Sequence, residues 1–153
     1  MAAGAFIFPD KAILNFFSAT NLVNPANTFK ITLHTSGWTP NAATNEVFAD
    51  VTNELSTANG YTAGGITLTG VALTQTSGVT KFTSAAAVWT ASGGSIPAWR
   101  YAVVRAVGTL NGKVDPIVGY FLGDATPADV PATTDTNTLT ITPHASGIMT
   151  ADQ

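Results

Sequence analysis

Hydrophobic and polar residues alternate in several short stretches of the chain. The clearest stretch is Phe29–His34, where Phe29, Ile31 and Leu33 are separated by polar side chains. It follows the turn signal Asn24-Pro25-Ala26-Asn27, since the residue before a proline avoids the helical conformation. Alternation over about four to eight residues is typical of a β-strand with one buried face. We therefore predict a strand at Phe29–His34 and a second one over residues 66–69.

Further alternating or apolar stretches follow at short intervals, separated by turn residues such as Gly93-Gly94 and Asn111-Gly112. We predict strands over residues 71–75, 79–83, 86–90, 99–107, 117–122 and 138–142. In residues 99–107 apolar side chains fall on both faces, as in a strand from the middle of a sheet. Closely spaced short strands favour an antiparallel β-sandwich or a Greek-key barrel over alternating strands and helices.

Two short helical segments complete the predicted fold, which is mainly β. Residues 10–18 carry three apolar side chains at helical spacing, and Asp10 is placed to cap a helix at this point. Residues 50–55 predict a short acidic helical turn. We predict exposed loops over residues 36–46 and 124–137. Trp38 is the one large apolar side chain of the first loop.

The length of 153 residues fits one hydrophobic core. We predict an apolar N-terminal arm over residues 1–9, followed by a single β-rich domain over residues 10–153. The arm contains Phe6, Ile7 and Phe8, whereas a terminus exposed to water is usually polar. These side chains are expected either to fold into the core of their own chain or to contact a neighbouring protein.

The composition limits the partners of the chain. Charged residues make up 10% of the sequence, against roughly 25% in an ordinary soluble domain, and the formal net charge is −3. A neutral, Thr-rich surface repels neighbours weakly, which favours permanent assembly. No cluster of basic residues marks a nucleic-acid contact, and neither a secretion signal nor an apolar run of membrane-spanning length is visible. We therefore predict a soluble protein without direct nucleic-acid or membrane partners.

The sequence shows no familiar motif for catalysis or metal binding. The chain has no cysteine and two histidines, His34 and His144, which lack metal-ligand spacing. No GxSxG motif marks a nucleophile, and His34 is expected on the polar face of its strand. Asp50 and Glu54 have the spacing of neighbours on one face of a helix. We prefer to interpret Asp50 as a helix cap and Glu54 as a solvated side chain, and an acid–base pair is the alternative. We predict no catalytic residue, no metal site and no cofactor.

The aromatic residues suggest a different kind of site. Flat aromatic rings with polar rims suit sugar rings, and this hypothesis concerns Trp38, Tyr61, Trp89, Trp99 and Tyr101. Aromatic residues at strand positions more often belong to the core. An exposed ring in a shallow groove would favour the sugar-binding hypothesis.

Several turn and strand signatures resemble small structural proteins of tailed bacteriophages, encoded in their head and tail gene modules. The resemblance spans most of residues 10–149. The segments that carry it are Phe29-Lys30-Ile31-Thr32-Leu33, Asp50-Val51-Thr52-Asn53-Glu54, Gly60-Tyr61-Thr62-Ala63-Gly64-Gly65-Ile66-Thr67-Leu68, Ala87-Val88-Trp89-Thr90 and the ending Thr140 to Met149. The resemblance implies a β-rich virion component present in many copies. It carries no catalytic motif.

Within this class we expect a capsid decoration, or cement, protein on the outer capsid surface, made in the host cytoplasm. Such a protein binds across subunits of the major capsid protein, and a homotrimer in the particle is the expected geometry. The predicted assembly interface consists of Phe6, Ile7, Phe8, Trp38 and Tyr61. The alternative is a tail-fibre or receptor-binding module that recognises a host glycan, and a small hydrolase is a third hypothesis.

Overall fold

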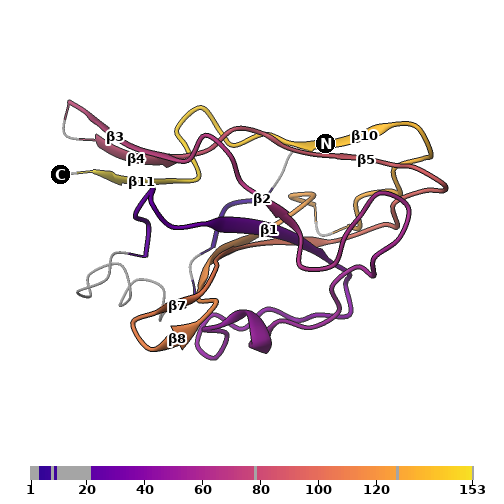
Figure 1. Ribbon diagram of the computed structural model, residues 1–153, viewed down its shortest axis with the longest axis horizontal. Helices are drawn as coiled ribbons and strands as arrows, with labels where there is room; N and C mark the ends of the chain where they lie inside the picture. The colour runs from indigo at the N-terminus through magenta and orange to yellow at the C-terminus, as the bar shows by residue number, and fades with distance from the viewer. Residues whose placement is uncertain (1–3, 8, 10–21, 78, 127, 153) are drawn as a thin grey trace.

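The computed structural model describes residues 4–7, 9, 22–77, 79–126 and 128–152. The helix predicted over residues 10–18 lies outside these residues. The chain is mainly β and its sheets are antiparallel, which confirms the predicted fold class. The strands form two layers, with β1, β2, β6 and β9 in one layer and the other long strands above one of its faces (Figure 1).

The first layer is a four-stranded sheet in the order β2-β1-β6-β9. Its strands are β2 (Ile66–Thr67), β1 (Phe29–His34), β6 (Tyr101–Ala106) and β9 (Ile117–Leu122). Strand β6 pairs with β1 on one side and with β9 on the other. Residues 102–106 of this strand are all buried. The sequence prediction of a central strand, based on apolar residues on both faces, is therefore confirmed.

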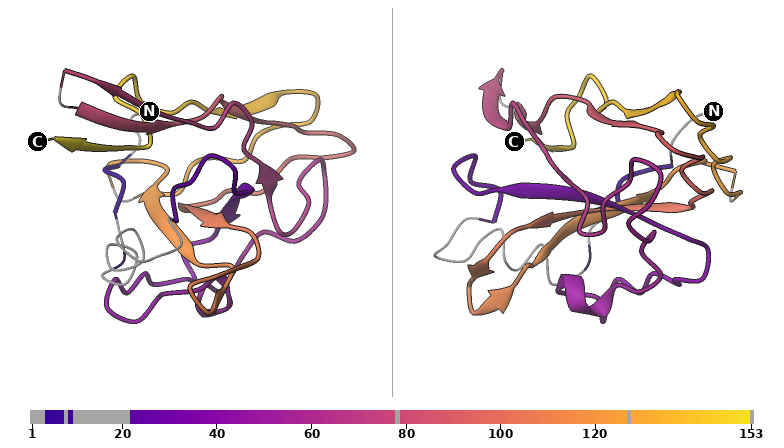
Figure 2. Two further views of the ribbon diagram at one scale, coloured as in Figure 1. Left: turned by 60° about the vertical axis from the view of Figure 1, so that its left-hand side comes forward. Right: turned by 45° about the vertical axis from the view of Figure 1, so that its right-hand side comes forward.

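The second layer contains two smaller sheets (Figure 2). One has the order β11-β4-β3 and consists of β11 (Met149–Asp152), β4 (Val79–Thr83) and β3 (Ala72–Thr76), and the other pairs β10 (Thr138–Ile141) with β5 (Ala87–Thr90). The main hydrophobic core lies between the layers, where the rings of Phe29 and Phe82 meet edge to face at 5.1 Å. This packing of two sheet faces defines a sandwich.

The opposite face of the first sheet is covered by the chain between β1 and β2. Trp38 from this segment packs with Val103, Ile117 and Tyr120 in a second hydrophobic cluster. The hairpin of β7 (Thr109–Leu110) and β8 (Lys113–Val114) lies at one end of the first layer, between β6 and β9 in the chain. Its turn residues have positive φ angles, as a tight two-residue hairpin turn requires. Both faces of the central strands are thus enclosed.

One predicted element is wrong. Residues 50–55 do not form a helical turn; a short 3-10 helix, η1 (Phe48–Asp50), ends where that turn was predicted to begin. The Asp50 carboxylate accepts the backbone N–H groups of Glu46 and Val47 at 2.8 and 3.0 Å, so it closes the preceding turn instead of opening a helix. The chain then extends along β1, where the Leu55 N–H donates to the Leu33 carbonyl.

Candidate functional site

The described residues of the N-terminal arm lie along the outer edge of the first sheet. The Gly4 N–H donates to the Leu122 carbonyl at 2.8 Å, and Ile7 and Tyr120 exchange backbone hydrogen bonds of 2.7 and 2.9 Å. The arm therefore extends the sheet beyond β9 and satisfies edge groups that water or another chain would otherwise bind. This edge is closed by the chain itself.

Two arm residues have different surroundings. Phe6 is partly buried, packs against the main core and lies 6.1 Å from the Phe121 ring between centroids. Ile7 is 41% exposed, and Phe8 lies outside the described residues. Phe6 thus folds into the core of its own chain, and Ile7 presents its side chain to the surroundings.

Gly119 makes room for the Phe6 ring. A Cβ atom at this position would lie 2.0 Å from Phe6 Cε1 and 2.8 Å from the Ile7 carbonyl oxygen. We therefore expect Gly119→Ala to displace the arm from β9. The loss should be about 2 kcal/mol in the free energy of unfolding, the value of burying one large apolar side chain, measured by chemical denaturation.

The same experiment has internal controls. Phe6→Ala should cost about as much as Gly119→Ala, and the double variant should cost little more than either, because both remove the same contact. Ile7→Ala, at the exposed neighbour, should change the stability by about 0.5 kcal/mol or less. Additive effects of the first two substitutions would contradict the proposed contact.

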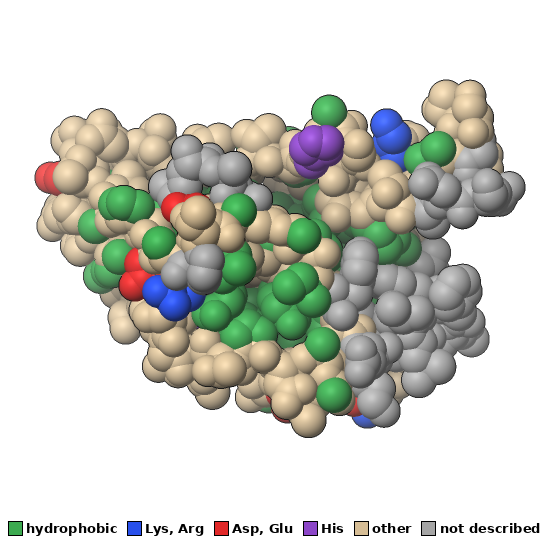
Figure 3. Space-filling view, turned by 180° about the vertical axis from the view of Figure 1, so that it is seen from behind, with side chains coloured by type: hydrophobic (Ala, Val, Ile, Leu, Met, Phe, Trp, Pro, Cys, Tyr) green, Lys and Arg blue, Asp and Glu red, His purple; other side chains and the backbone are tan. Residues whose placement is uncertain are grey.

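An apolar cavity of about 590 Å³ opens between the two layers beside the arm. Its walls come from the arm, the inner face of the first sheet and the second layer, and they include Phe6, Ile31, Leu68, Val104, Phe121 and Ile148. Among the described residues that line the cavity, none is Asp, Glu, Lys or Arg, and His144 is the titratable one. Hydrophobic side chains gather on the side of the molecule shown in Figure 3. This cavity suits an apolar group and offers no acid–base pair.

The other two predicted interface residues are buried in their own chain. Trp38 is 3% exposed and packs edge to face against Tyr101 and Tyr120 at 5.3 and 5.5 Å. Tyr61 is 1% exposed and belongs to the main core. Trp38 packs against Tyr120, whose backbone pairs with Ile7 of the arm, and both Trp38 and Tyr61 serve the fold as core residues.

Burial also bears on the sugar-binding hypothesis. That hypothesis needs an exposed ring at Trp38, Tyr61 or Trp99, and Trp99 is 3% exposed as well. A sugar ring can stack only on an aromatic face that water reaches. None of the three positions offers such a face in the described chain.

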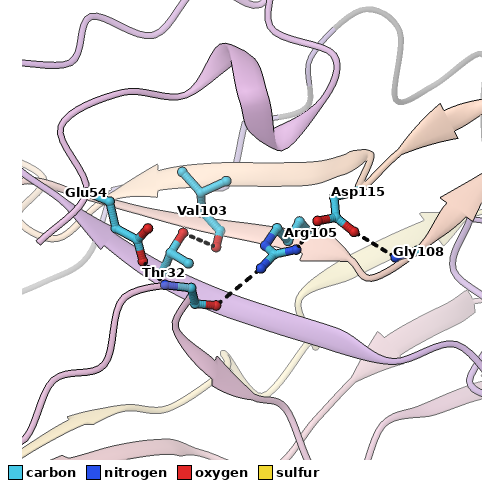
Figure 4. A network of polar contacts seen from close by, with 7 residues as sticks. Thr32, Glu54, Val103, Arg105, Gly108 and Asp115 are labelled. Atoms are coloured by element: carbon cyan, nitrogen blue, oxygen red, sulfur yellow. Dashed lines mark hydrogen bonds and ion pairs between the residues drawn. The ribbon is translucent and has the colours of Figure 1, made fainter. Parts of the chain in front are cut away.

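A polar network lies on the face of the first sheet that the segment between β1 and β2 covers (Figure 4). Glu54 accepts hydrogen bonds from the Tyr61 hydroxyl at 2.7 Å and from the Gly64 N–H at 2.6 Å. The Tyr61 hydroxyl in turn accepts the Leu33 N–H at 3.0 Å. Burial is the largest cause that raises the pKa of Tyr61 far above its usual range. Tyr61 therefore stays protonated and bridges two segments of backbone.

Arg105 and Asp115 form the charged part of this network. The Arg105 Nη1 lies 2.6 Å from the Asp115 carboxylate, and Nη2 donates to the Gly64 carbonyl at 3.3 Å. The guanidinium also lies over the Phe48 ring, 4.2 Å from its centroid. The Gly108 N–H donates to the second Asp115 oxygen at 2.7 Å. These contacts bind the β7–β8 hairpin and the 3-10 helix to the sheet, which is a structural task.

His34 lies on the face of β1 opposite Phe29, Ile31 and Leu33, as its place in the alternation predicts, but this face is buried. It is fully buried, Nδ1 donates to the Thr52 carbonyl at 2.9 Å, and Nε2 lies 2.8 Å from the Thr32 hydroxyl. Burial is the largest cause that lowers the pKa of His34, and the Thr52 carbonyl and Glu54 oppose it. Both ring nitrogens are engaged within the protein. The arrangement leaves no nitrogen for a substrate proton.

The lowered pKa of His34 predicts a pH-dependent stability. Below the ordinary pKa of about 6.5, the unfolded chain binds a proton that the folded His34 resists. The free energy of unfolding should therefore fall as the pH drops from about 7.5 to about 5, by up to about 1.4 kcal/mol per pH unit from this residue. Denaturation curves across this range measure the effect.

One variant isolates the contribution of His34. His34→Gln should flatten the pH dependence of the free energy of unfolding, because glutamine binds no proton in this range. Equal slopes for the native chain and His34→Gln would contradict the assignment.

Among the described residues, no group of three or more His, Cys, Asp or Glu side chains is placed to hold a metal ion. Asp50 and Glu54, the carboxylate pair at helical spacing, bind different backbone groups and do not act together. None of the described helices has the length and apolar character needed to cross a membrane.

Sequence reasoning missed the cavity and the Arg105–Asp115 pair. The cavity walls come from segments spread over the whole chain, so no local pattern signals it. Asp115 gave a weak signal, as a single acid after the Asn111-Gly112 turn. Comparison of the chain with protein-family models, with curated proteins and with solved structures found no match.

Proposed function

We propose that this chain is a non-enzymatic structural protein of a bacteriophage virion, which decorates the outer capsid surface. It binds across subunits of the major capsid protein, as a homotrimer in the particle. The observation that carries the proposal is the uncharged apolar cavity beside the N-terminal arm, in a chain whose polar network is engaged in holding the fold. The resemblance of the turn and strand signatures to phage head and tail proteins is the reason for proposing a phage virion as the place where the protein acts.

The charge distribution supports an assembly role. With 10% charged residues the surface offers little long-range repulsion to a neighbour. When an apolar side chain of a partner enters a pocket on such a surface and displaces water, the burial of apolar surface makes binding more favourable. The occupant in this proposal is an apolar side chain of the capsid shell.

Stabilisation of the shell follows from linkage. A protein that binds only the assembled shell favours assembly by an amount that grows with its concentration and affinity. Such a mechanism requires a rigid scaffold and a contact surface, and the two-layered sandwich with its closed β9 edge provides the scaffold. No active-site residue takes part.

Copy number in purified virions tests the proposal. A decoration protein should occur in numbers that match the capsid lattice, on the order of hundreds per particle for a large shell, measured by quantitative mass spectrometry against the major capsid protein. A count of about a dozen or fewer would overturn decoration and would place the chain in the tail or at the portal vertex.

Two adjacent alanines allow a second test of the cavity. Ala85 and Ala86 are both exposed, and Ala85 lines the cavity while Ala86 does not. Ala85→Arg should abolish binding of the purified protein to undecorated capsids in a co-sedimentation assay, because it puts a bulky charge into the apolar pocket. Ala86→Arg should bind as the native chain does. Equal binding of both variants would exclude the cavity as the contact.

A further inference from the structure

Strand β3 is a sheet edge that none of the described segments covers. It is the outer strand of the sheet β11-β4-β3, and no other described segment donates or accepts a backbone hydrogen bond along it. By contrast, the outer edge of β9 is covered by the arm. The β3–β4 hairpin extends outward at one end of the molecule (Figures 1 and 2).

This edge carries none of the devices that normally prevent edge-to-edge pairing. Natural edge strands are protected by charged side chains, prolines, bulges or short length. Strand β3 reads Ala-Leu-Thr-Gln-Thr, and no Asp, Glu, Lys or Arg occurs from residue 55 to residue 80. Its pairing with β4 is regular over five residues. The strand is therefore competent to pair with a further strand.

The hydrogen bonds of β4 show which β3 groups point outward. The Phe82 carbonyl accepts the Ile148 N–H at 2.8 Å, so it points toward β11 and away from β3. Leu73 lies opposite Phe82 and is therefore in a non-hydrogen-bonded pair with β4. Because this pattern alternates, the N–H and C=O groups of Leu73 and Gln75 face outward.

We propose that β3 pairs with β3 of a second copy of this chain, antiparallel across a two-fold axis at Thr74. This register is the one that pairs all five residues of the strand. Leu73 then exchanges backbone hydrogen bonds with Gln75 of the second copy, and Thr74 faces Thr74. The result is a continuous six-stranded sheet, in which the three strands of each copy meet at β3.

The side chains favour a second copy over a different partner. In this register each side chain faces a neutral one, so the identical strands meet without like-charge repulsion. A charged partner segment would find no opposite charge on β3. The contact is isologous, because the same strand of both copies takes part. A two-fold contact of this kind cannot close a ring of three, so it is separate from the interface of the proposed trimer. The inference does not depend on the proposed virion role.

A single introduced cysteine tests the register. The chain has no cysteine, and Thr74 is exposed. In a non-hydrogen-bonded antiparallel pair the Cα atoms are about 4.5 Å apart, within disulfide range. At a protein concentration at which the native chain is dimeric, mild oxidation should convert most of Thr74→Cys into a disulfide-linked dimer. Thr90→Cys, at an exposed position of β5, should stay monomeric.

A charge-exchange experiment tests the contact without cross-linking. The native chain should show twice the monomer mass at high concentration in sedimentation analysis. Thr74→Lys alone and Thr74→Glu alone should each remain monomeric, and their mixture should regain the dimer, because unlike charges then face each other. Circular dichroism confirms that each variant is folded.

Several results would overturn the inference. One is a native chain that stays monomeric at all concentrations; another is equal cross-linking of Thr74→Cys and Thr90→Cys. A dimer that persists in Thr74→Lys would place the contact elsewhere. Binding of β3 only to an extended segment of another protein would replace the second copy by that partner.

Discussion

Gly65→Ala is expected to lower the free energy of unfolding by about 3 kcal/mol or more, the largest effect of any small substitution considered. A Cβ atom at this position would lie 2.0 Å from the Ile31 carbonyl oxygen and 2.7 Å from Thr32 Cγ2. The φ angle of +71° is itself unfavourable for alanine. Since the clash is with the backbone of β1, relief requires β2 to move away from the sheet.

Gly93 provides the matched control. Its φ angle of +77° is similar to that of Gly65, but nothing lies within 4 Å of an added Cβ atom. Gly93→Ala should therefore cost about 1 kcal/mol, the conformational part alone. Chemical denaturation of both variants separates the steric part from the conformational part. Equal losses would show that β2 yields easily and would contradict the close approach to β1.

Asp115→Asn is expected to cost about 2 to 3 kcal/mol of stability. The substitution removes the charge that faces the buried Arg105 guanidinium but keeps an acceptor for the Gly108 N–H. Breaking a buried ion pair by removing one partner typically costs about 3 to 5 kcal/mol. The Asp115 side chain is 28% exposed, so water compensates part of the loss.

A surface pair and a double variant test this explanation. Asp129→Asn, in the more exposed Arg100–Asp129 pair, should cost about 1 kcal/mol or less. Adding Arg105→Met to Asp115→Asn should recover stability relative to Asp115→Asn alone, because it removes the unpaired buried charge. A double variant that is less stable than the single one would show that Arg105 acts mainly through the Phe48 ring and the Gly64 carbonyl.

The sequence predicted most of the strands because their signals are local. Alternation identified β1 with its observed bounds, short stretches between turn residues predicted β4 and β9 with theirs, and the apolar character of both faces placed β6 inside its sheet. Strand β11 was not predicted. Its residues pair with β4, about seventy residues earlier in the chain, and no local pattern reveals such a partner.

The wrong prediction of a helical turn over residues 50–55 and the unexpected burial of His34 have the same origin. Asp50 has the residue type of a helix cap, but its carboxylate binds the preceding backbone because residues 51–55 extend along β1. His34 follows the alternation of its strand, but the face that alternation predicts to be polar is covered by a long loop. In both cases a distant segment decided the environment of the side chain.

The sequence by itself determined that the protein is a β-rich chain of low charge without cysteine, since propensity, periodicity and composition are local or additive properties. Only the tertiary structure decided that Phe6 lies against Gly119, that Trp38 and Tyr61 are buried, and that a cavity opens between the layers. It also decided which sheet edge is covered and which, at β3, is not. These features arise from contacts between residues far apart in the chain, and such contacts leave no periodic trace in the sequence.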